Sequence, residues 1–347
     1  MKHSLQISHF GGPECLKLIS SESNPLSPHT VRVKVKASGV NFADIMMRMG
    51  LYPEAPKPPF VPGYEISGTI TEIGPQVKSL QVGDRVFGGC RFGGYTTEIV
   101  LPESQLRRIP ERLSDQEAAG IPVNFLTAWF ALMEMARVRK NDRVLIHSAA
   151  GGVGTAAVQM AAQVGAQVVG LVGSEGKKAI VRSLGAQEVI LNSEWEGCSD
   201  SEAGGFDLIL DPTGGASLKR SLRRLLPSGR LVNYGASSLV GGERRSLFRL
   251  LRFATQTTFF TPFGLMMGNQ GVFGLNLLQL FSEAEHPEHP SRLEAALDLL
   301  LEKFKDGSYK VILGQTFPLT EGGAAHQTLQ SRSNIGKIIL TADEALP

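Results

Sequence analysis

Residues 143–154 read RVLIHSAAGGVG, and this stretch decides the fold of the chain. Its first half, Arg143–His147, is a short apolar segment that predicts a buried β-strand. Its second half is glycine-rich, and small and apolar residues then recur at helical spacing as far as Val164. A strand that runs through a tight glycine turn into a helix is typical of a site that binds a dinucleotide. The sequence therefore predicts a dinucleotide-binding turn at this place.

The predicted turn follows the spacing A-x-G-x-x-G, with Ala149 in the first position. Such a turn needs a sharp bend, a backbone that is open to a diphosphate, and close packing of the helix on the sheet. The free N–H groups and the dipole at the start of the helix then hold the diphosphate. The residues that we expect to form this cradle are Ala150, Gly151, Gly152, Val153 and Gly154.

Strands and helices alternate beyond this turn. The further strands are predicted at 168–172, 188–191, 207–210 and 230–234, with helices between them that include 178–184 and 218–226. These strands are apolar on both faces, which is typical of a parallel sheet that helices cover on both sides. The sequence therefore predicts an α/β fold with a doubly wound, Rossmann-type parallel sheet.

The end of the second predicted strand bears on which dinucleotide is bound. NAD sites usually place an acid there, on the ribose 2′-hydroxyl. Here the strand leads into Gly173 and Ser174, and Lys177 and Lys178 follow. Small residues followed by lysines favour a 2′-phosphate, and therefore NADPH. Glu175 leaves NADH as the alternative, because a small shift of register would make it that acid.

The first hundred residues have a different texture. Val31–Lys36 alternates apolar and basic side chains, Ile66–Ile73 is rich in β-branched residues, and a Gly-Asp turn precedes Arg85–Phe87. These patterns predict strands. Five prolines between residues 53 and 62 predict an ordered loop with a restricted backbone. We therefore expect a first domain that is rich in β-structure.

The composition limits the classes of function. The 347 residues carry 35 Lys and Arg against 33 Asp and Glu, a net charge of +2 that provides no broad basic surface for nucleic acid. Three isolated cysteines and a polar start without a secretory signal predict a reduced, cytoplasmic protein. The uncharged segment 253–282 contains glycines and a proline, so we expect it to be buried or at a subunit interface and disfavour membrane contact.

Several spaced motifs resemble the medium-chain dehydrogenase/reductase superfamily. Besides the glycine turn they are ASGVNFAD at 37–44, PGYEISG at 62–68, GDRV at 83–86 and GK at 336–337. The resemblance spans nearly the whole chain. It implies a GroES-like catalytic domain, residues 1–123 and 306–347, which is interrupted by a Rossmann domain for NADPH, residues 124–305. A cleft between the two domains is also implied.

Departures from the zinc-dependent branch of that superfamily narrow the resemblance. Zinc alcohol dehydrogenases carry a cysteine ligand where this chain has Asn41 and a histidine where it has Tyr64. Three scattered cysteines cannot supply their second zinc site, so we expect no metal. Asn41, Asp44 and Tyr52 instead resemble the quinone oxidoreductase, or ζ-crystallin-like, branch. The stretch 244–275 is similar to the vesicle amine transport protein homologues within that branch.

The quinone oxidoreductase branch implies hydride transfer from NADPH to a quinone or an α,β-unsaturated carbonyl compound, an activity of the EC 1.6.5 or 1.3.1 type. Negative charge then develops on the substrate oxygen, where hydrogen-bond donors must meet it. The resemblance gives that role to the Asn41 amide and the Tyr52 hydroxyl, whereas Asp44 is interpreted as a structural capping acid. A capping role for Asn41 and a loop-anchoring role for Tyr52 are the alternatives.

The resemblance also implies cofactor contacts outside the glycine turn. Thr127 is expected to face the nicotinamide, and Tyr234 with Gly235 to pass beside the nicotinamide ribose. Asn334 and Lys337 are expected to close the cleft from the far end of the chain.

Two other functions stay open. The chain can be a nucleotide-sensing binding or scaffold protein with vestigial reductase activity, or it can be an enoyl-thioester reductase. The uncharged segment and the arginines at 245, 249 and 252 motivate the first alternative, although a solvated helical face is the simpler interpretation of those arginines. We expect a homodimer that acts on a small molecule, with no nucleic-acid partner.

Overall fold

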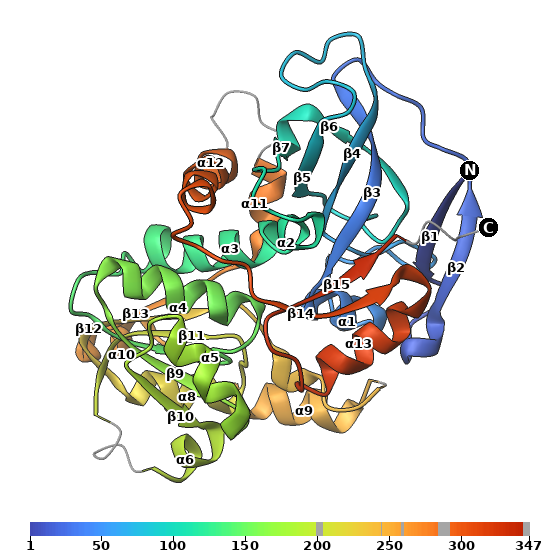
Figure 1. The fold of residues 1–347 in the computed structure, drawn as a ribbon. Helices are drawn as coiled ribbons and strands as arrows, with labels where there is room; N and C mark the ends of the chain where they lie inside the picture. The colour runs from blue at the N-terminus through green and yellow to red at the C-terminus, as the bar shows by residue number, and fades with distance from the viewer. Residues whose placement is uncertain (199–203, 244, 258–259, 284–291, 343–347) are drawn as a thin grey trace. The chain divides into compact units, whose positions relative to one another are not determined.

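The computed structural model describes residues 1–198, 204–243, 245–257, 260–283 and 292–342 (Figure 1). They form two compact units. The first comprises Met1–Val123, Gly242–Arg245 and Leu278–Pro347, and the second comprises Asn124–Gly241 and Ser246–Leu277. The residues predicted to form the functional site are divided between the two units.

The second unit is built on a six-stranded parallel sheet in the order β10-β9-β8-β11-β12-β13. The strands are β8 (Arg143–Ile146), β9 (Gln167–Val172), β10 (Glu188–Leu191), β11 (Phe206–Asp211), β12 (Leu225–Asn233) and β13 (Gly271–Gly274). The chain winds outward from β8, first to β9 and β10 and then to β11, β12 and β13. This topology confirms the predicted doubly wound sheet. Ligands bind such sheets at the carboxyl ends of the strands where the winding reverses, which here lies between β8 and β11.

Helices cover this sheet. The helices packed on its strands include α4 (Gly152–Val164), α5 (Lys178–Ser183), α6 (Asn192–Gly197) and α8 (Ala216–Arg223). The unit also contains α3 (Pro122–Trp129), which a π-helical turn, Phe130–Met135, continues, and α9 (Leu247–Gln256) and α10 (Pro262–Gly268), which have no buried residues. Strands β8, β9 and β11 are buried almost from end to end. Both faces of the central strands are therefore excluded from water, as the sequence predicts for a parallel sheet.

One boundary in the second unit differs from its prediction. The sequence predicts a helix to Leu226 and a strand only from Arg230, whereas α8 ends at Arg223 and β12 already begins at Leu225. The pairing of β12 with β11 jumps from Phe206–Leu225 to Leu208–Arg230. The intervening residues therefore form a bulge within the strand, which is how a proline and glycine fit into it.

The first unit is built on a seven-stranded sheet. The order of six of its strands is β14-β15-β3-β4-β5-β7, and β6 pairs with β3. The strands are β3 (Thr30–Val40), β4 (Glu65–Ile73), β5 (Arg85–Gly89), β6 (Glu98–Pro102), β7 (Leu106–Arg108), β14 (Leu313–Pro318) and β15 (Lys337–Thr341), with a separate hairpin of β1 (Lys2–Ile7) and β2 (Leu16–Ser21). Because β15 pairs antiparallel with β3, the last described strand completes the sheet of the first hundred residues.

The helices of the first unit are α1 (Phe42–Arg48), α2 (Asp115–Ala119), most of α11 (Leu277–Glu283), α12 (Arg292–Lys305) and α13 (Gly322–Gln330). Residues 278–305, which the sequence analysis places in the Rossmann domain, are therefore grouped with the first unit. Arg107 explains part of this difference, because its Nε lies 2.6 Å from Asp298 Oδ1 on α12. The Gln279 amide likewise donates to Glu54 Oε1 over 2.6 Å.

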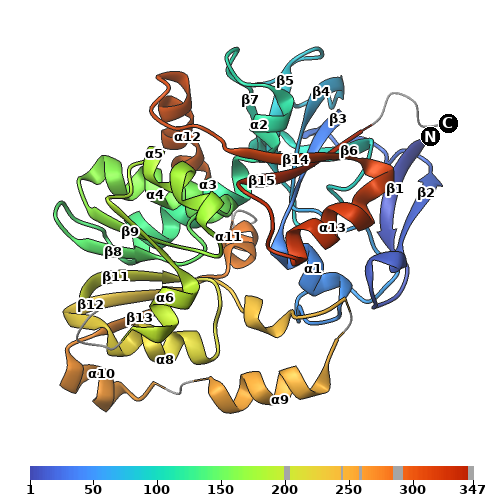
Figure 2. The same ribbon diagram turned by 60° about the horizontal axis from the view of Figure 1, so that its bottom comes forward.

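The segment predicted to be buried or at a subunit interface, residues 253–282, is buried in this chain only in part, at residues such as Leu275 and Leu278, and carries exposed apolar side chains on α10. Its place at a subunit interface stays a prediction. Figure 2 shows α9 and α10 one after the other along one side of the second unit. The exposed side chains of the segment are Phe263 (68%), Met266 (64%) and Met267 (69%), and α9 adds Leu247 (75%), Phe248 (74%) and Leu251 (65%) just before it. Thr258 and Phe259, in the same segment, lie outside the described residues. None of the helices that the structure describes combines the length and the apolar character needed to cross a membrane.

Candidate functional site

In the glycine turn of the second unit, two glycines have different roles. A Cβ atom on Gly154 would overlap the carbonyl oxygen of Ser148 and lie 2.7 Å from the Cα of Ala149. This glycine therefore lets α4 pack directly on the turn. A Cβ atom on Gly151 would meet only Ser148 O, at 3.2 Å, among described atoms within 4 Å and outside its chain neighbours. The backbone of Gly151, the N-cap of α4, is therefore open to a ligand.

Alanine fits the first position of the motif because its neighbours compensate for it. The left-handed conformation that often requires glycine falls on Ser148, with φ of 54°, rather than on Ala149. On the adjacent strand β9, a Cβ atom on Gly170 would lie 3.0 Å from the Cβ of Ala149 and 2.7 Å from Val181 Cγ1. The absence of a side chain at Gly170 thus makes room for the methyl group of Ala149.

Helix α3 supplies a neighbour of the turn that the sequence analysis does not name. A Cβ atom on Gly152 would lie 2.5 Å from the side-chain nitrogen of Asn124, which is itself buried. Thr127, the residue expected beside the nicotinamide, is also buried and follows three residues later. Residues three apart share a face of a helix, so Thr127 lies on the face of α3 that meets the glycine turn. The signal for Asn124 was its spacing from Thr127.

The end of β9 carries the residues expected to select the dinucleotide. Gly173 and Ser174 are exposed, and Ser174 begins a short turn through Lys177. Lys178 Nζ lies 2.8 Å from Glu175 Oε1 and 3.7 Å from Glu194 Oε2. The acid that would favour NADH is therefore paired with a lysine, while burial lowers the pKa of Lys177.

The ends of β11 and β12 are tied together by buried polar groups. The Asp211 carboxylate accepts hydrogen bonds from the backbone N–H of Thr213 at 2.7 Å and from the Ser217 hydroxyl at 2.7 Å. The Asn233 amide donates to the carbonyl oxygens of Asp211 and Gly235, both at 2.9 Å. These contacts fix the loop that contains Tyr234 and Gly235. Burial, with a smaller contribution from Asp211, raises the pKa of the Tyr234 hydroxyl.

The predicted cofactor residues of the second unit consequently follow the carboxyl ends of β8, β9 and β12, with Thr127 on α3. In the first unit, Asn334 lies just before β15, where its amide donates to Gly336 O at 3.0 Å. Lys337, at the start of β15, extends its side chain into a buried polar cluster.

This cluster joins Asn41, Glu65 and Lys337, which are 7%, 0% and 3% exposed. The Asn41 amide donates from Nδ2 to Glu65 Oε1 over 3.0 Å. The Lys337 ammonium donates to Asn41 Oδ1 over 2.5 Å and also lies 2.5 Å from Glu65 Oε1. The second carboxylate oxygen, Glu65 Oε2, accepts the Val123 N–H at 2.7 Å. A predicted catalytic residue and a predicted cofactor residue are thus in direct contact.

Asp44 caps helix α1, as the sequence analysis interprets it. Its Oδ2 accepts the backbone N–H of Asn41 at 2.8 Å and the Tyr95 hydroxyl at 2.9 Å, and its Oδ1 accepts the Gly63 N–H at 3.2 Å. Burial outweighs these donors and raises the pKa of the Asp44 carboxyl to about 7. On its other side the Tyr95 oxygen lies 3.2 Å from Nε2 of His326.

Tyr52, the second predicted donor, lies on an apolar cluster rather than on the Asn41 cluster. It is half-buried against residues that include Tyr64, Met47 and Phe60. The Tyr64 hydroxyl donates to Met47 Sδ at 3.4 Å. Burial, followed by the neighbouring Tyr52, raises the pKa of Tyr64, so the two phenols lie close together. Their aromatic bodies form the apolar part of the candidate site in this unit.

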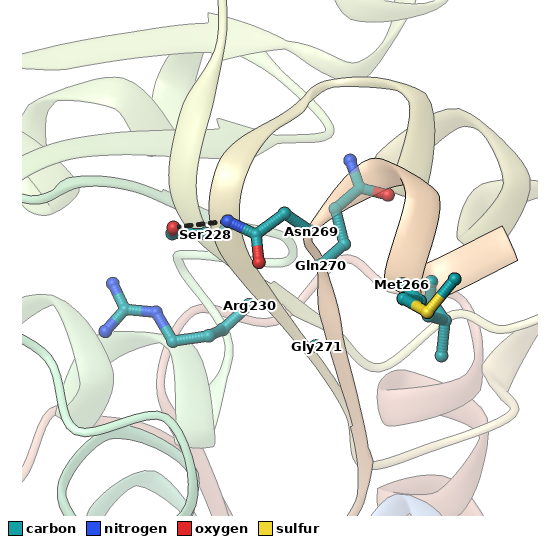
Figure 3. Close-up of a pocket in the computed structure, with 8 residues that line it drawn as sticks. Ser228, Arg230, Met266, Asn269, Gln270 and Gly271 are labelled. Carbon is teal, nitrogen blue, oxygen red and sulfur yellow. Dashed lines mark hydrogen bonds between the residues drawn. The ribbon is translucent and has the colours of Figure 1, made fainter. Parts of the chain in front are cut away.

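A pocket of about 350 Å³ in the second unit lies at the opposite end of its sheet (Figure 3). It is lined by the beginnings of β12 and β13, including Arg230 and Gln270, whereas the cofactor residues follow strand ends. The Asn269 amide donates to the Ser228 hydroxyl at 2.9 Å, and Arg230 Nη2 lies 2.7 Å from Asp142. These polar groups already have protein partners.

Comparisons with known proteins agree with the fold of the two units. The family model of the alcohol dehydrogenase GroES-like domain matches residues 27–111, and the zinc-binding dehydrogenase model matches residues 152–283. A synaptic vesicle membrane protein VAT-1 homolog from Danio rerio is 34% identical over 344 residues, which is 98% of this chain and 70% of that protein.

Two solved structures extend the comparison to known folds. The Escherichia coli quinone oxidoreductase complexed with NADPH gives a TM-score of 0.83 at 26% identity, over 98% of this chain and 100% of that chain. The CurK enoyl reductase gives a TM-score of 0.81 at 27% identity, over 98% of this chain and 99% of that chain. Both matches span the two units that the structure describes.

The residues present do not fit the zinc ion that one family description names. Among the residues that the structure describes, there is no group of three or more His, Cys, Asp or Glu side chains that could hold a metal. Asn41 and Glu65 share an ammonium group, so a cation already lies between the two oxygens that could attract a metal. An amide and a phenol, at Asn41 and Tyr64, are also poor substitutes for thiolate and imidazole.

The first family model matches residues of the first unit, and the second matches mostly residues of the second unit. The VAT-1 homolog and the quinone oxidoreductase confirm the narrower resemblance drawn from Asn41, Tyr52 and the stretch 244–275. The chain belongs to the medium-chain dehydrogenase/reductase superfamily of oxidoreductases, in its quinone oxidoreductase-like and VAT-1-like branch.

Proposed function

We propose that the chain is an NADPH-dependent, zinc-independent reductase of quinones or α,β-unsaturated carbonyl compounds. The observation that carries the proposal is the buried cluster of Asn41, Glu65 and Lys337, which puts an amide and an ammonium where the zinc enzymes of the superfamily hold a metal. The match to an NADPH-complexed quinone oxidoreductase supports the choice of cofactor and of substrate class.

The second unit would bind the dinucleotide through its backbone. The open N–H groups at the start of α4, beginning beside Gly151, suit a diphosphate. At the end of β9, Ser174 and the two lysines suit a 2′-phosphate, because Lys178 offsets the charge of Glu175. Thr127, Tyr234 and Gly235 lie on the elements that complete the proposed cofactor site.

When bound, NADPH supplies a hydride to the β-carbon of an enone or to a quinone ring, and a proton completes the reduced product. The protein must then stabilise negative charge on the substrate oxygen. The Asn41 amide and the Tyr52 hydroxyl are the proposed donors. One amide hydrogen of Asn41 is committed to Glu65, whereas the other has only a 3.4 Å contact with Gly39 O, so it is available to a substrate.

The direct test is turnover at 340 nm with NADPH and a panel of quinones and 2-alkenals. The proposal expects substrate-dependent oxidation of NADPH, and it expects Asn41→Ala to lower kcat/KM by about 100-fold, as loss of an oxyanion donor does. Asn24→Ala is the matched control, because Asn24 is exposed and its side chain accepts a hydrogen bond from Lys2 over 3.3 Å. Tight NADPH binding without turnover on any substrate would instead support the nucleotide-sensing alternative.

An enoyl thioester is the second candidate substrate, and the match to the CurK enoyl reductase favours it. The same reaction applies, because an enoyl thioester is also an α,β-unsaturated carbonyl compound. Adding crotonyl thioesters to the panel distinguishes the two classes. A kcat/KM for thioesters well above that for every quinone would reassign the substrate while keeping the proposed hydride transfer.

A further inference from the structure

We propose that Glu65 and Lys337 are positioning residues, which hold the side-chain amide of Asn41 in the single orientation that presents its second N–H, the one with only a long, 3.4 Å contact to Gly39 O. The inference rests on the proposed function, in which this amide stabilises negative charge on the substrate oxygen. It goes further by assigning a task to two residues that would otherwise be a buried ion pair and a cofactor contact.

An amide can rotate by half a turn with little change in shape, so its neighbours must decide which end is nitrogen. Here the two ends meet opposite partners. The carboxylate of Glu65 is an acceptor and faces Nδ2 over 3.0 Å, while the ammonium of Lys337 is a donor and faces Oδ1 over 2.5 Å. The reversed amide would set its oxygen against the carboxylate and its N–H groups against the ammonium.

Burial strengthens the preference for this orientation of the Asn41 amide. Glu65 and Lys337 are almost fully excluded from water, so their charges act on the amide through a medium of low polarisability. The two charges also neutralise each other at 2.5 Å, so the cluster as a whole carries no net charge. The pair therefore orients the amide without placing a net charge beside the proposed substrate.

The sheet of the first unit holds the three residues in register. Asn41 directly follows β3, Glu65 begins β4 and Lys337 begins β15, and β3 lies between the other two strands. The pairing of Val40 with Ile338 brings the Lys337 side chain beside Asn41. A strand framework fixes side-chain positions better than a loop would.

Gly39 is the position that allows the three side chains to meet. A Cβ atom there would overlap Glu65 Oε1 and lie 2.7 Å from Lys337 Cε. The glycine therefore opens the space in which the ion pair sits. Its carbonyl oxygen also faces the second amide hydrogen of Asn41 at 3.4 Å, which is too long to compete strongly with a substrate.

Glu65→Gln is the decisive variant because Val123 fixes the new side chain. Its N–H donates to Glu65 Oε2 at 2.7 Å, so it will hold the carbonyl oxygen of a glutamine and turn the glutamine NH₂ toward Asn41. A donor then replaces the acceptor on that side. We expect the Asn41 amide to lose its orientation, kcat to fall about 10-fold to 100-fold, and the KM for NADPH to stay within about twofold.

A second variant separates positioning from folding. In Glu65→Gln/Asn41→Asp the aspartate accepts hydrogen bonds from both the glutamine NH₂ and Lys337, and the cluster is neutral again. We expect the Tm to recover while reductase activity stays low, because no amide donor remains. Asp142→Asn is the matched control, since it changes an acid to an amide in the half-buried Arg230–Asp142 pair of the second unit. It should leave kcat unchanged.

The readout that does not depend on turnover is the NMR signal of the Asn41 side-chain amide in the full chain labelled with ¹⁵N-asparagine. Asn41→Asp assigns the signal. The proposal expects two distinct, slowly exchanging amide protons in the wild type, and averaged or fast-exchanging ones in Glu65→Gln. Unchanged amide signals, or an unchanged kcat, in Glu65→Gln would overturn the inference. Wild-type protein that shows the two protected protons but no turnover would instead overturn the proposed function alone.

Discussion

The glycine turn of the second unit and the Asn41 cluster of the first unit, the two parts of the proposed site, are built in opposite ways. The turn exposes backbone: a Cβ atom on Gly151 would meet one described atom within 4 Å outside its chain neighbours. The cluster uses charged side chains that are almost fully buried and already paired with one another. Backbone groups serve a part of the ligand that every dinucleotide shares, whereas fixed side chains suit a site where charge develops during a reaction.

The largest expected effect breaks the turn itself. Gly154→Ala places a Cβ atom against Ser148 O and 2.7 Å from Ala149 Cα, both backbone atoms, so we expect it to destabilise the fold by about 3 kcal/mol. Gly151→Ala is the matched control, because its Cβ makes a single tight contact, 3.2 Å from Ser148 O, rather than an overlap; it should cost about 1 kcal/mol at most and weaken NADPH binding about 10-fold. Urea denaturation and NADPH titration measure the two effects. Equal loss of stability in both variants would contradict the division of work between the glycines.

The next effect concerns His326 in the first unit. Burial, and then the neighbouring Arg48, lowers its pKa to about 3 from an ordinary value near 6.5. The folded protein therefore binds fewer protons than the unfolded chain between these pH values. The stability that neutral His326 provides is present above about pH 6.5 and is lost as the pH falls toward 3.

His326→Gln should flatten this part of the stability curve, by about 1.4 kcal/mol per pH unit at the steepest point. The measurement is urea denaturation of variant and wild type at matched pH values, so that other titrating groups cancel. Gln keeps a hydrogen-bonding partner for the Tyr95 hydroxyl, which lies 3.2 Å from His326 in the wild type. A difference in stability that does not vary with pH would mean that His326 does not titrate in this range.

The titration of Asp44 changes the stability with pH in the opposite direction to that of His326. Burial raises its pKa to about 7 from about 4, so the folded state binds more protons than the unfolded chain between these values. The contribution of the protonated acid is present below about pH 4 and is lost as the pH rises through 7. The groups that face Asp44 are Tyr95, Lys337, Glu65 and the backbone of Asn41.

The wild type should therefore lose stability between about pH 4.5 and pH 8 as Asp44 ionises. Asp44→Asn should not show this loss when the two proteins are compared at each pH. If Asp44 stays ionised to a lower pH, its titration changes the stability over a narrower pH range than that of His326 does. The same denaturation series measures this pH range. Wild-type and variant curves that run parallel across this range would show that the Asp44 carboxyl keeps its ordinary pKa. That result would place a permanent negative charge, on Asp44, beside the Asn41 cluster.

The smallest expected effect sharpens the cofactor choice in the second unit. Glu175 is exposed and pairs with Lys178 at 2.8 Å, so Glu175→Ala should leave the lysine with only the longer, 3.7 Å pairing to Glu194 and strengthen NADPH binding about twofold, since exposed ion pairs contribute little. The ratio of the Kd values for NADPH and NADH is the measurement. A weakened NADH affinity with unchanged NADPH affinity would instead identify Glu175 as the acid that binds the ribose.

The same two regions show how far sequence reasoning reaches. The glycine turn was predictable because its parts are contiguous: strand, turn and helix follow one another within residues 143–164. The room that Gly170 makes for the methyl group of Ala149 was not predictable, because it depends on which strand lies beside β8. The start of β12 was also misplaced, because a bulge lets Pro227 and Gly229 lie inside a strand.

In the Asn41 cluster, the sequence motif identified Asn41, and Lys337 was expected to contact the cofactor. Neither pattern indicated that the two side chains touch, or that Glu65 joins them, because the contact depends on the register of three strands. His326 and Tyr95 carried no signal at all, since a buried histidine is defined by its surroundings. The predicted homodimer and cytoplasmic location stay predictions.

The position of β15 has a consequence for how the protein is made. Asn41 and Lys337 are 296 residues apart in sequence, and the whole second unit is synthesised between them. A growing chain can form the local strands and helices of the second unit well before Lys337 leaves the ribosome. Until then Glu65 lacks its counter-charge, and the first sheet lacks the strand beside β3. The cluster that begins at Asn41 therefore cannot assemble until Lys337 has been synthesised, after the whole of the second unit.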